Sequence, residues 1–345
     1  MKMFARSAAI AVMAAWSVSS AFAAEPTSYQ FEKVADGVYF GKPNMPGRMD
    51  CNVMVVVGDK DVLLMDGGTE KDSAQKLLAD VKTLTDKPVR YVVNSHFHFD
   101  HAGGNEGFGA DVKIITSEYS AKRLSGNPYA GITFQRFFGA SGTQPQALAT
   151  MKADLAKETD AAKKADMQAR IKGIEEQMAV LKTAKARTGD IVVKDKYIIP
   201  RAAGEIQVLY MGRAHTGGDL TVYLPKEGIV ATGDYMQNGL AYMGDSYLEE
   251  WPKTLEALKG LKFDLVIGGH GPSFHGTTKI VAYQGYLREF AKQAAAMKKQ
   301  GVSADDASKR MDLSAFKGEF PQAATGAPLP GVIRYYEILD GKDTP

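Results

Sequence analysis

The sequence predicts an α/β fold in which two β-sheets pack face to face and helices cover their outer faces. Short runs rich in β-branched residues gather in two groups, at residues 32–116 and 191–267. Amphipathic helical stretches close each group, and because a sheet must bury its apolar face, two such halves favour a layered sandwich. Five of the six histidines also follow predicted strands, in loops flanked by glycine.

The composition fits one large or two small globular domains. The chain has 345 residues, 45% of them hydrophobic, which is ample for a buried core. Its 42 basic and 40 acidic residues give a net charge of +2, so nothing suggests nucleic acid or an anionic membrane as a partner. Cys51 is the only cysteine, which excludes an intramolecular disulfide, and we expect its thiol to be buried.

Residues 1–24 are typical of a cleaved signal peptide. Lys2 and Arg6 precede an apolar stretch at 8–18, and Ala21-Phe22-Ala23 forms a small-x-small cleavage signal. The mature chain, 25–345, is therefore expected in the periplasm or outside a bacterial cell. The apolar stretch is short for a membrane span and no later segment is longer, so we expect no stable membrane insertion after cleavage. A retained N-terminal anchor is the alternative.

The first half is predicted to alternate strands and helices. Its expected strands and helices are a strand at 32–41, a hairpin of 51–57 and 61–65, a helix at 70–84, strands at 88–93 and 111–116, and a short helix ending at 124. Residues 42–50 connect the first strands through a loop with Pro43, Pro46 and Gly47. We expect this loop to be a mobile flap that selects substrate.

Residues 144–187 differ in composition and predict an inserted helical hairpin. They are rich in Ala, Lys, Glu and Gln, and Met167, Ile171, Ile174, Met178 and Leu181 repeat at spacings of four and three. The turn is expected near residues 160–165. A lid or dimer arm and a plain surface insertion both remain open.

The second half returns to strands. Its expected elements are strands at 191–193, 206–211, 220–224, 229–232 and 264–267, and helices at 249–261 and 277–299. Residues 277–345 form a C-terminal helical extension.

The stretch at 94–104, "NSHFHFDHAGG", places four metal-ligating side chains within six residues: His96, His98, Asp100 and His101. It follows the strand at 88–93 directly, and Gly103 and Gly104 would give the backbone freedom to leave the loop. Imidazole and carboxylate groups suit zinc or a similar divalent metal. A surface loop that is merely rich in histidine is the alternative.

Three later loops supply further ligands of the same kind. They are His215 in "GRAHTGGD", Asp234 in "ATGDYM" and His270 in "VIGGHGP". A lone histidine after a strand is more often an ordinary loop residue. Histidines recur in this way after strands in both halves of the chain, together with two aspartates. This recurrence predicts a single metal centre to which both halves contribute ligands.

With "LLMDGG" around Asp66, these motifs make residues 37–275 resemble the metallo-β-lactamase superfamily. The resemblance implies an αββα sandwich of two mixed sheets with two metal ions at one sheet edge. The metals would be zinc, with iron or manganese as alternatives. It also implies that Asp66 orients the histidine loop. Asp219 is expected to anchor the backbone after His215, with an ordinary turn aspartate as the alternative. The implied ligands are His96, His98 and His215 for the first metal, Asp100, His101 and His270 for the second, and Asp234 as a bridge.

The resemblance further implies an exported zinc-dependent hydrolase. A hydroxide held by both metals would cleave an amide or ester-type bond of a small molecule, β-lactam rings included, with Asp100 and Asp234 as catalytic residues. The alternatives are a thioester or lactone hydrolase similar to glyoxalase II, an iron-using relative, and a non-catalytic periplasmic binder of a metal or ligand. Some β-lactamases carry a lysine where this chain has Gln237, which leaves the substrate open. Tyr235, Gln237, Asn238 and Tyr242 are expected to line the site, with simple core packing as the alternative for the two tyrosines.

Overall fold

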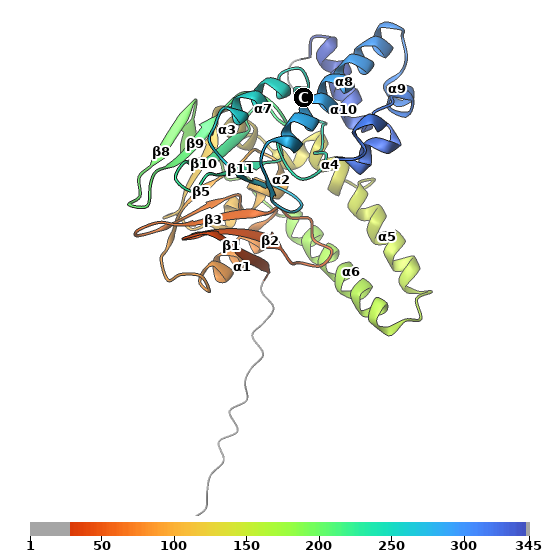
Figure 1. Ribbon diagram of the computed structural model, residues 1–345. Coiled ribbons are helices and arrows are strands. Elements are labelled where there is room, and N and C mark those ends of the chain that lie inside the picture. The colour runs from red at the N-terminus through yellow and green to blue at the C-terminus, as the bar shows by residue number, and fades with distance from the viewer. Residues whose placement is uncertain (1–27, 343–345) are drawn as a thin grey trace, which may run out of the picture.

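The computed structural model describes residues 28–342 and has the expected layered architecture (Figure 1). The predicted signal peptide, residues 1–24, lies outside the described residues. Within them two mixed β-sheets, of seven and six strands, are flanked by helices. The α/β prediction of two packed sheets with an inserted helical hairpin is confirmed.

The first sheet contains strands β1 to β7 in chain order. The pairs β1–β2, β2–β3 and β3–β4 are antiparallel, whereas the pairs β4–β5, β5–β6 and β6–β7 are parallel. The strands are β1 (Tyr29–Ala35), β2 (Val38–Pro43), β3 (Val53–Val57), β4 (Val62–Met65), β5 (Val89–Val93), β6 (Lys113–Ser117) and β7 (Ile191–Val193).

The second sheet has the order β13-β12-β11-β10-β9-β8. Only the β11–β12 pair in this sheet, among the residues described, is parallel. The strands are β8 (Lys196–Ile199), β9 (Ile206–Tyr210), β10 (Leu220–Leu224), β11 (Ile229–Gly233), β12 (Leu265–Gly268) and β13 (Phe274–His275).

Alternating side chains of the central strands enter two different cores. In β3, Met54 and Val56 face the core between the sheets, while Val53 and Val55 pack toward α1. In β11, Ile229 and Ala231 likewise face the space between the sheets. Both faces of these strands are buried, which explains why their sequences are continuous apolar runs instead of alternating ones.

The helices lie outside the two sheets, and a pair of them extends from the body. In Figure 1, α5 and α6 project away from the sandwich as an antiparallel arm, and α8 to α10 gather beside the C-terminus. The helices are α1 (Lys71–Val81), α2 (Phe99–Ala102), α3 (Glu118–Ser125), α4 (Ile132–Phe138), α5 (Thr143–Leu155), α6 (Ala161–Leu181), α7 (Trp251–Lys259), α8 (Thr278–Lys299), α9 (Ala304–Arg310) and α10 (Leu329–Leu339).

Several element boundaries differ from the expectation. The single strand expected at 32–41 is a hairpin, because Gly37 adopts φ 67° and turns the chain between β1 and β2. The turn of the α5–α6 arm lies before residues 160–165, since the Asp160 side chain accepts a hydrogen bond from the Lys163 amide and caps α6. Strand β8 and helix α4 were not predicted.

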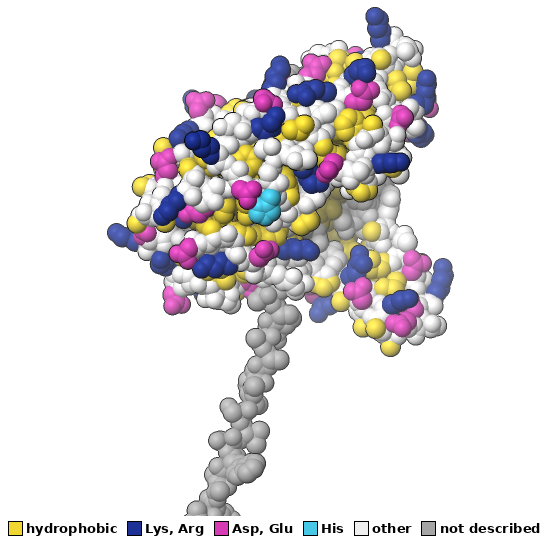
Figure 2. Space-filling model, in the orientation of Figure 1, with side chains coloured by type: hydrophobic (Ala, Val, Ile, Leu, Met, Phe, Trp, Pro, Cys, Tyr) yellow, Lys and Arg dark blue, Asp and Glu magenta, His cyan; other side chains and the backbone are white. Residues whose placement is uncertain are grey.

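The surface mixes charges of both signs. Figure 2 shows lysine and arginine side chains interspersed with aspartate and glutamate over this face, in keeping with the nearly balanced composition. In the described part of the chain, no helix combines the length and the apolar character that a membrane span requires.

Candidate metal centre

The histidine loop leaves β5 at Val93 and is held by Asp66, which follows β4. The Ser95 amide donates to Asp66 Oδ1 at 2.7 Å, and His101 Nδ1 lies 2.8 Å from Asp66 Oδ2. Asp66 has a φ of 68°, a left-handed conformation that aspartate tolerates better than most residues. The expected orienting contacts of Asp66 are therefore present, and they leave His101 Nε2 facing the centre.

Gly103 and Gly104 serve a different purpose from the one expected. Neither has a positive φ. A Cβ on Gly103 would collide with the Thr69 carbonyl oxygen, and one on Gly104 with the Gly67 carbonyl oxygen. Glycine is needed because the turn that follows the ligands packs directly against the backbone after β4.

The second sheet delivers three more predicted ligands to the same edge. His215 follows β9, Asp234 follows β11, and His270 follows β12. The loop after His215 is closed by Asp219, whose two carboxylate oxygens accept the Thr216 amide and hydroxyl at 2.8 Å each. This is the anchoring role expected of Asp219.

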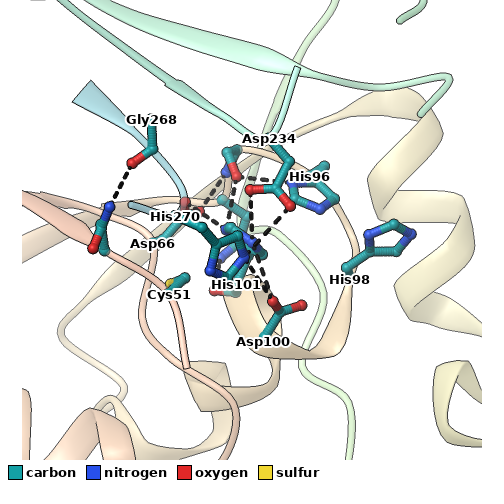
Figure 3. Close-up of polar contacts among 12 residues, drawn as sticks. Cys51, Asp66, His96, His98, Asp100, His101, Asp234, Gly268 and His270 are labelled. Carbon is teal, nitrogen blue, oxygen red and sulfur yellow. Dashed lines mark hydrogen bonds and ion pairs between the residues drawn. The ribbon is translucent and has the colours of Figure 1, made fainter. Parts of the chain in front are cut away.

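All seven predicted ligands meet in one cluster. Figure 3 labels each of them except His215. The ligating atoms form three groups that each fit within 4.8 Å: His96, His98 and His215; Asp100, His101 and His270; and His96, His101 and Asp234. These are the two ligand sets that the resemblance implies, together with a third group that joins them.

Asp234 lies between the two ligand sets. Its Oδ1 is 3.3 Å from His101 Nε2, and its Oδ2 is 3.5 Å from His270 Nε2 and 3.8 Å from His215 Nε2. In Figure 3, Asp234 and Asp100 approach His101 from opposite sides. A carboxylate in this position can contact two cations at once.

Asp245 is a functional candidate that the sequence did not reveal. Its Oδ2 lies 2.9 Å from His98 Nε2 and accepts a hydrogen bond from the Thr133 hydroxyl at 2.5 Å. Because Nε2 of His98 is engaged, Nδ1 is the atom left to face His215 Nε2, at 3.1 Å. Asp245 therefore fixes which nitrogen of His98 can bind a metal.

The electrostatics of the cluster keep Asp234 ionised, leave His96 and His215 neutral, and favour the protonated form of His270. Burial lowers the pKa of His215 to about 3 and, with the neighbouring histidines, holds the pKa of His96 well below its usual value. Burial would raise the pKa of Asp234, but His270 and His101 outweigh it and hold that pKa well below the usual range. Burial would lower the pKa of His270, but Asp234 and Asp100 raise it to about 10.

The donor atoms fit a pair of divalent metal ions. His96 Nε2, His101 Nε2 and Asp234 Oδ1 are buried without a hydrogen-bond partner among the described residues. Buried polar atoms without a hydrogen bond are costly, and a metal ion bound by these three atoms would satisfy them. The nitrogen and oxygen donor set suits zinc, although it does not distinguish zinc from iron or manganese.

A pocket of about 320 Å³ opens onto these ligands. Its wall includes Met49, Asp50, Thr133, Phe137, Gln237 and Tyr242 beside His98, Asp100, Asp234 and His270. Gln237 and Tyr242 were expected there. The expectation for Tyr235 is wrong, because its ring is buried in the core and its hydroxyl pairs with Thr221. Asn238 is not part of this wall.

Residues 42–50, which were expected to form a mobile flap, are partly in a strand and otherwise hydrogen-bonded to and packed against helix α6. Lys42 and Pro43 belong to β2. The Met49 amide donates to Gln177 Oε1 at 2.9 Å, and Gln177 Nε2 donates back to the Met49 carbonyl at 2.8 Å. A Cβ on Gly173 of α6 would collide with the Pro46 carbonyl oxygen. The loop therefore forms one wall of the pocket and is held in place by the arm helix α6 behind it.

Cys51 lies beside the centre but is not one of the predicted ligands. It is fully buried, and its sulfur is grouped within 4.8 Å of ligating atoms of Asp66 and His101. Burial raises the pKa of the thiol well above its usual value, so the group stays protonated. The expectation of a buried thiol is confirmed.

The model of the metallo-beta-lactamase superfamily matches residues 46–270, from the loop after β2 to the last predicted ligand. The chain belongs to this superfamily. The resemblance seen in the sequence is confirmed, and the His and Asp cluster agrees with the metal dependence of the superfamily.

Two curated relatives of this superfamily member align with about two thirds of the chain. The linear primary-alkylsulfatase of Pseudomonas sp. (strain ATCC 19151) is 23% identical over 238 residues, 66% of this chain and 42% of that protein. Metallo-beta-lactamase IND-1 of Chryseobacterium indologenes is 26% identical over 241 residues, 68% of this chain and 75% of that protein. The match therefore spans less than half the length of the alkylsulfatase.

Solved structures show the same fold. A metallo-beta-lactamase from Pontibacter korlensis superposes with a TM-score of 0.53 at 19% identity, covering 75% of this chain and 99% of that one. The VMB-1 structure gives a TM-score of 0.52 at 16% identity, covering 77% and 100%.

Proposed function

We propose that this metallo-beta-lactamase superfamily protein is a hydrolase that uses two zinc ions to cleave an amide or ester-type bond in a small molecule. The observation that carries the proposal is the position of Asp234 between two three-residue ligand sets, at the floor of an open pocket. The β-lactamase relatives make a β-lactam ring one candidate substrate.

The bound metals would supply Lewis acidity and the means to activate water at neutral pH. The protein's own residues do the rest of the work. Asp245 and Asp66 fix the ring orientations of His98 and His101, so little reorganisation is needed when substrate binds. Asp100 lines the pocket with its Oδ2 3.1 Å from His270 Nε2. Burial would raise the pKa of Asp100, but His101 and His270 outweigh it and hold that pKa well below the usual range, so the carboxylate is ionised and suited to bind a metal.

A second candidate reaction is hydrolysis of a sulfate ester. The alkylsulfatase relative, which aligns over 66% of this chain, favours it. Both reactions place a negative charge on the departing or attacked group, so the same pocket could serve either. The substrate screen below separates them.

The test begins with metal content. After zinc loading, elemental analysis of the purified protein should give about two equivalents per chain, and Asp234→Asn should reduce this number because the bridge is weakened. Asp264→Asn is the matched control, since Asp264 is 77% exposed and its ion pair within residues 28–342 is with His275. One equivalent in the wild type, unchanged in Asp234→Asn, would contradict the two-metal proposal.

The substrate class is tested by a parallel screen. Hydrolysis of a chromogenic cephalosporin, a lactone, a glutathione thioester and an aryl sulfate should identify one preferred class, and Asp234→Asn should lower that rate by orders of magnitude. The protein would be a non-catalytic binder if fully metal-loaded enzyme hydrolysed none of them.

Export is the remaining part of the proposal. The motif at residues 1–24 supports cleavage and release into the periplasm. N-terminal sequencing of protein recovered from a periplasmic fraction should begin near residue 24 or 25. Recovery of the uncleaved chain with the membrane fraction would instead favour the retained anchor.

A further inference from the structure

A second hollow, of about 620 Å³, adjoins the metal pocket. The two share Tyr242, which lines both. The hollow lies between α4 on one side and α10 on the other, and Arg136 of α4 and Ile333 of α10 contribute to its walls. A substrate seated at the metals could therefore extend past Tyr242 into this hollow.

The hollow is rich in positive charge. Four cationic side chains line it and one carboxylate, Glu337, accompanies them. Two of the cations pack against aromatic rings: the guanidinium carbon of Arg123 lies 4.7 Å from the ring centroid of Phe97, and that of Arg334 lies 5.1 Å from the ring centroid of Tyr247. The excess of cations predicts attraction for an anionic ligand.

Arg136, one of the four cations of the hollow, is hydrogen-bonded to Tyr242, the residue that also lines the metal pocket. Its Nη1 donates to the Tyr242 hydroxyl at 2.9 Å, and the Tyr242 ring centroid lies 6.0 Å from that of His98. Arg136 forms no ion pair with any carboxylate in residues 28–342, so its charge is not compensated there. A planar guanidinium with spare donors is well suited to a carboxylate or a sulfate.

The remainder of the hollow is apolar. Ile132, one turn before Arg136 on α4, is 64% exposed, and Pro330 and Ile333 face the same space. A large aliphatic side chain left this exposed beside an active-site pocket is unusual, since burying it would be favourable. The positive charge of Arg136 at one end of the hollow and the apolar surface beyond it would fit an anionic ligand with an apolar body.

We propose that Arg136 selects substrates that carry an anionic group, and that the apolar body of such a substrate covers Ile132. This inference rests on the proposed hydrolase function and names the substrate class of the same site. The anionic group, carboxylate or sulfate, would bind beside Tyr242 while the bond to be cleaved lies over the metals. Arg136 thus acts as a specificity-determining residue.

The first experiment compares matched substrates. From the class that the screen identifies, one substrate carries an anionic side group and its partner carries a neutral amide in the same place. Wild-type protein should prefer the anionic partner, mainly through KM, and Arg136→Gln should lower the anionic-to-neutral ratio of kcat/KM about tenfold to a hundredfold. Arg136→Lys should recover part of that ratio, and Lys164→Gln, on the exposed arm, should not change it.

The second experiment measures binding without turnover. Calorimetric titration of metal-loaded protein with hexyl and butyl sulfonates should show tighter binding of the longer chain, and Ile132→Ser should reduce that difference. Arg136→Gln should weaken both sulfonates and leave hexanol unaffected. Carboxylate analogues run in parallel distinguish the two anion types.

The outcomes separate this inference from the proposed function. Equal kcat/KM for anionic and neutral substrates, or an equal loss of both in Arg136→Gln, would overturn the role of Arg136 while hydrolysis stands. Sulfonate binding that depends on Arg136 in a protein that hydrolyses none of the substrates would keep the anion site and overturn the hydrolase.

Discussion

At the scale of single residues, the metal ligands are set by partners that are distant in sequence. Asp245 contacts His98 although the two are 147 residues apart in sequence, and Asp66 contacts His101 at a separation of 35 residues. Both carboxylates engage the nitrogen that points away from the centre. Ligand basicity and ring orientation should therefore depend on these two contacts as much as on the ligands themselves.

Replacing Asp245 by Asn should weaken the site formed by His96, His98 and His215. The amide keeps the shape but supplies a weaker acceptor to His98 Nε2, and loss of such a partner typically costs ten- to a hundred-fold in metal affinity. Competition with a chromophoric chelator measures this, with Asp264→Asn as the control. If Asp245→Asn retained wild-type affinity for both metals, the orienting role of Asp245 would be wrong.

Asp50, in the pocket wall, should make stability depend on pH. Burial, then the charge of Glu70, raises the pKa of Asp50 to about 7. Its Oδ2 is buried without a partner in the described chain, whereas Oδ1 accepts from the Tyr29 hydroxyl and the Cys51 amide. The folded state thus holds a proton that the unfolded chain releases near pH 4, so folding is favoured at low pH and loses this contribution as pH rises toward 7.

Asp50→Asn removes that titration. Relative to the variant, the wild type should lose about 1.4 kcal/mol of unfolding free energy per pH unit between pH 5 and 7, and the difference should level off above pH 7. Urea denaturation of both metal-loaded proteins across this range gives the comparison. Parallel pH profiles for the two proteins would show that Asp50 is ionised throughout.

The seven ligands could be predicted from the sequence because their spacing is local. His96, His98, Asp100 and His101 lie in one loop, and His215, Asp234 and His270 each follow a recognisable strand. Asp245 and Thr133 carry no such signal, since an aspartate beside glycine and a threonine on a short helix are ordinary loop and surface residues. Their roles arise from tertiary contact alone.

At the scale of elements, the arm helix α6 and the loop after β2 act as one unit. Arg48 Nη1 lies 2.6 Å from Glu70 Oε1, and its Nη2 lies 3.1 Å from Glu176 Oε2 on α6. Gln177 of α6 donates to the other Glu70 oxygen at 3.0 Å. The loop was expected to move because it contains Pro43, Pro46 and Gly47, but a loop's composition cannot show that a distant insertion will pack against it.

Arg48→Met should destabilise the protein strongly. The Glu70 side chain is fully buried and that of Arg48 is 5% exposed, so the variant leaves a buried carboxylate without its cation. Such losses cost about 3–5 kcal/mol. Adding Glu70→Gln should recover much of this, because the uncompensated charge is then removed as well.

The matched control is a surface ion pair on the same arm. Lys152 and Glu175 lie 2.6 Å apart but are 51% and 48% exposed, so Lys152→Met should cost at most about 1 kcal/mol. Urea denaturation midpoints compare the three variants. Equal, small losses for Arg48→Met and Lys152→Met would mean that the arm does not brace the pocket wall.

At the scale of the whole molecule, the metal centre lies where the two sheets meet. The first sheet provides His96, His98, Asp100 and His101 from the end of β5, and the second provides the other three ligands from the ends of β9, β11 and β12. The apolar runs that cross the core between the sheets predicted this layering. The hollow between α4 and α10 was beyond prediction, because packing between segments separated by some two hundred positions leaves no periodic signal.

Metal removal should therefore loosen the attachment of one sheet to the other. Ligands that bind the folded state alone stabilise it by about 2.7 kcal/mol at a hundredfold excess over Kd, and each metal is shared between loops of both sheets. Chelation of the loaded protein should lower Tm by roughly 5–10 °C. A variant with His215→Ala and His270→Ala has lost two of the three ligands from the second sheet, so its Tm should respond little to the chelator. An unchanged wild-type Tm, in protein that elemental analysis shows to have lost its metal, would mean that the sandwich is held by its apolar cores alone.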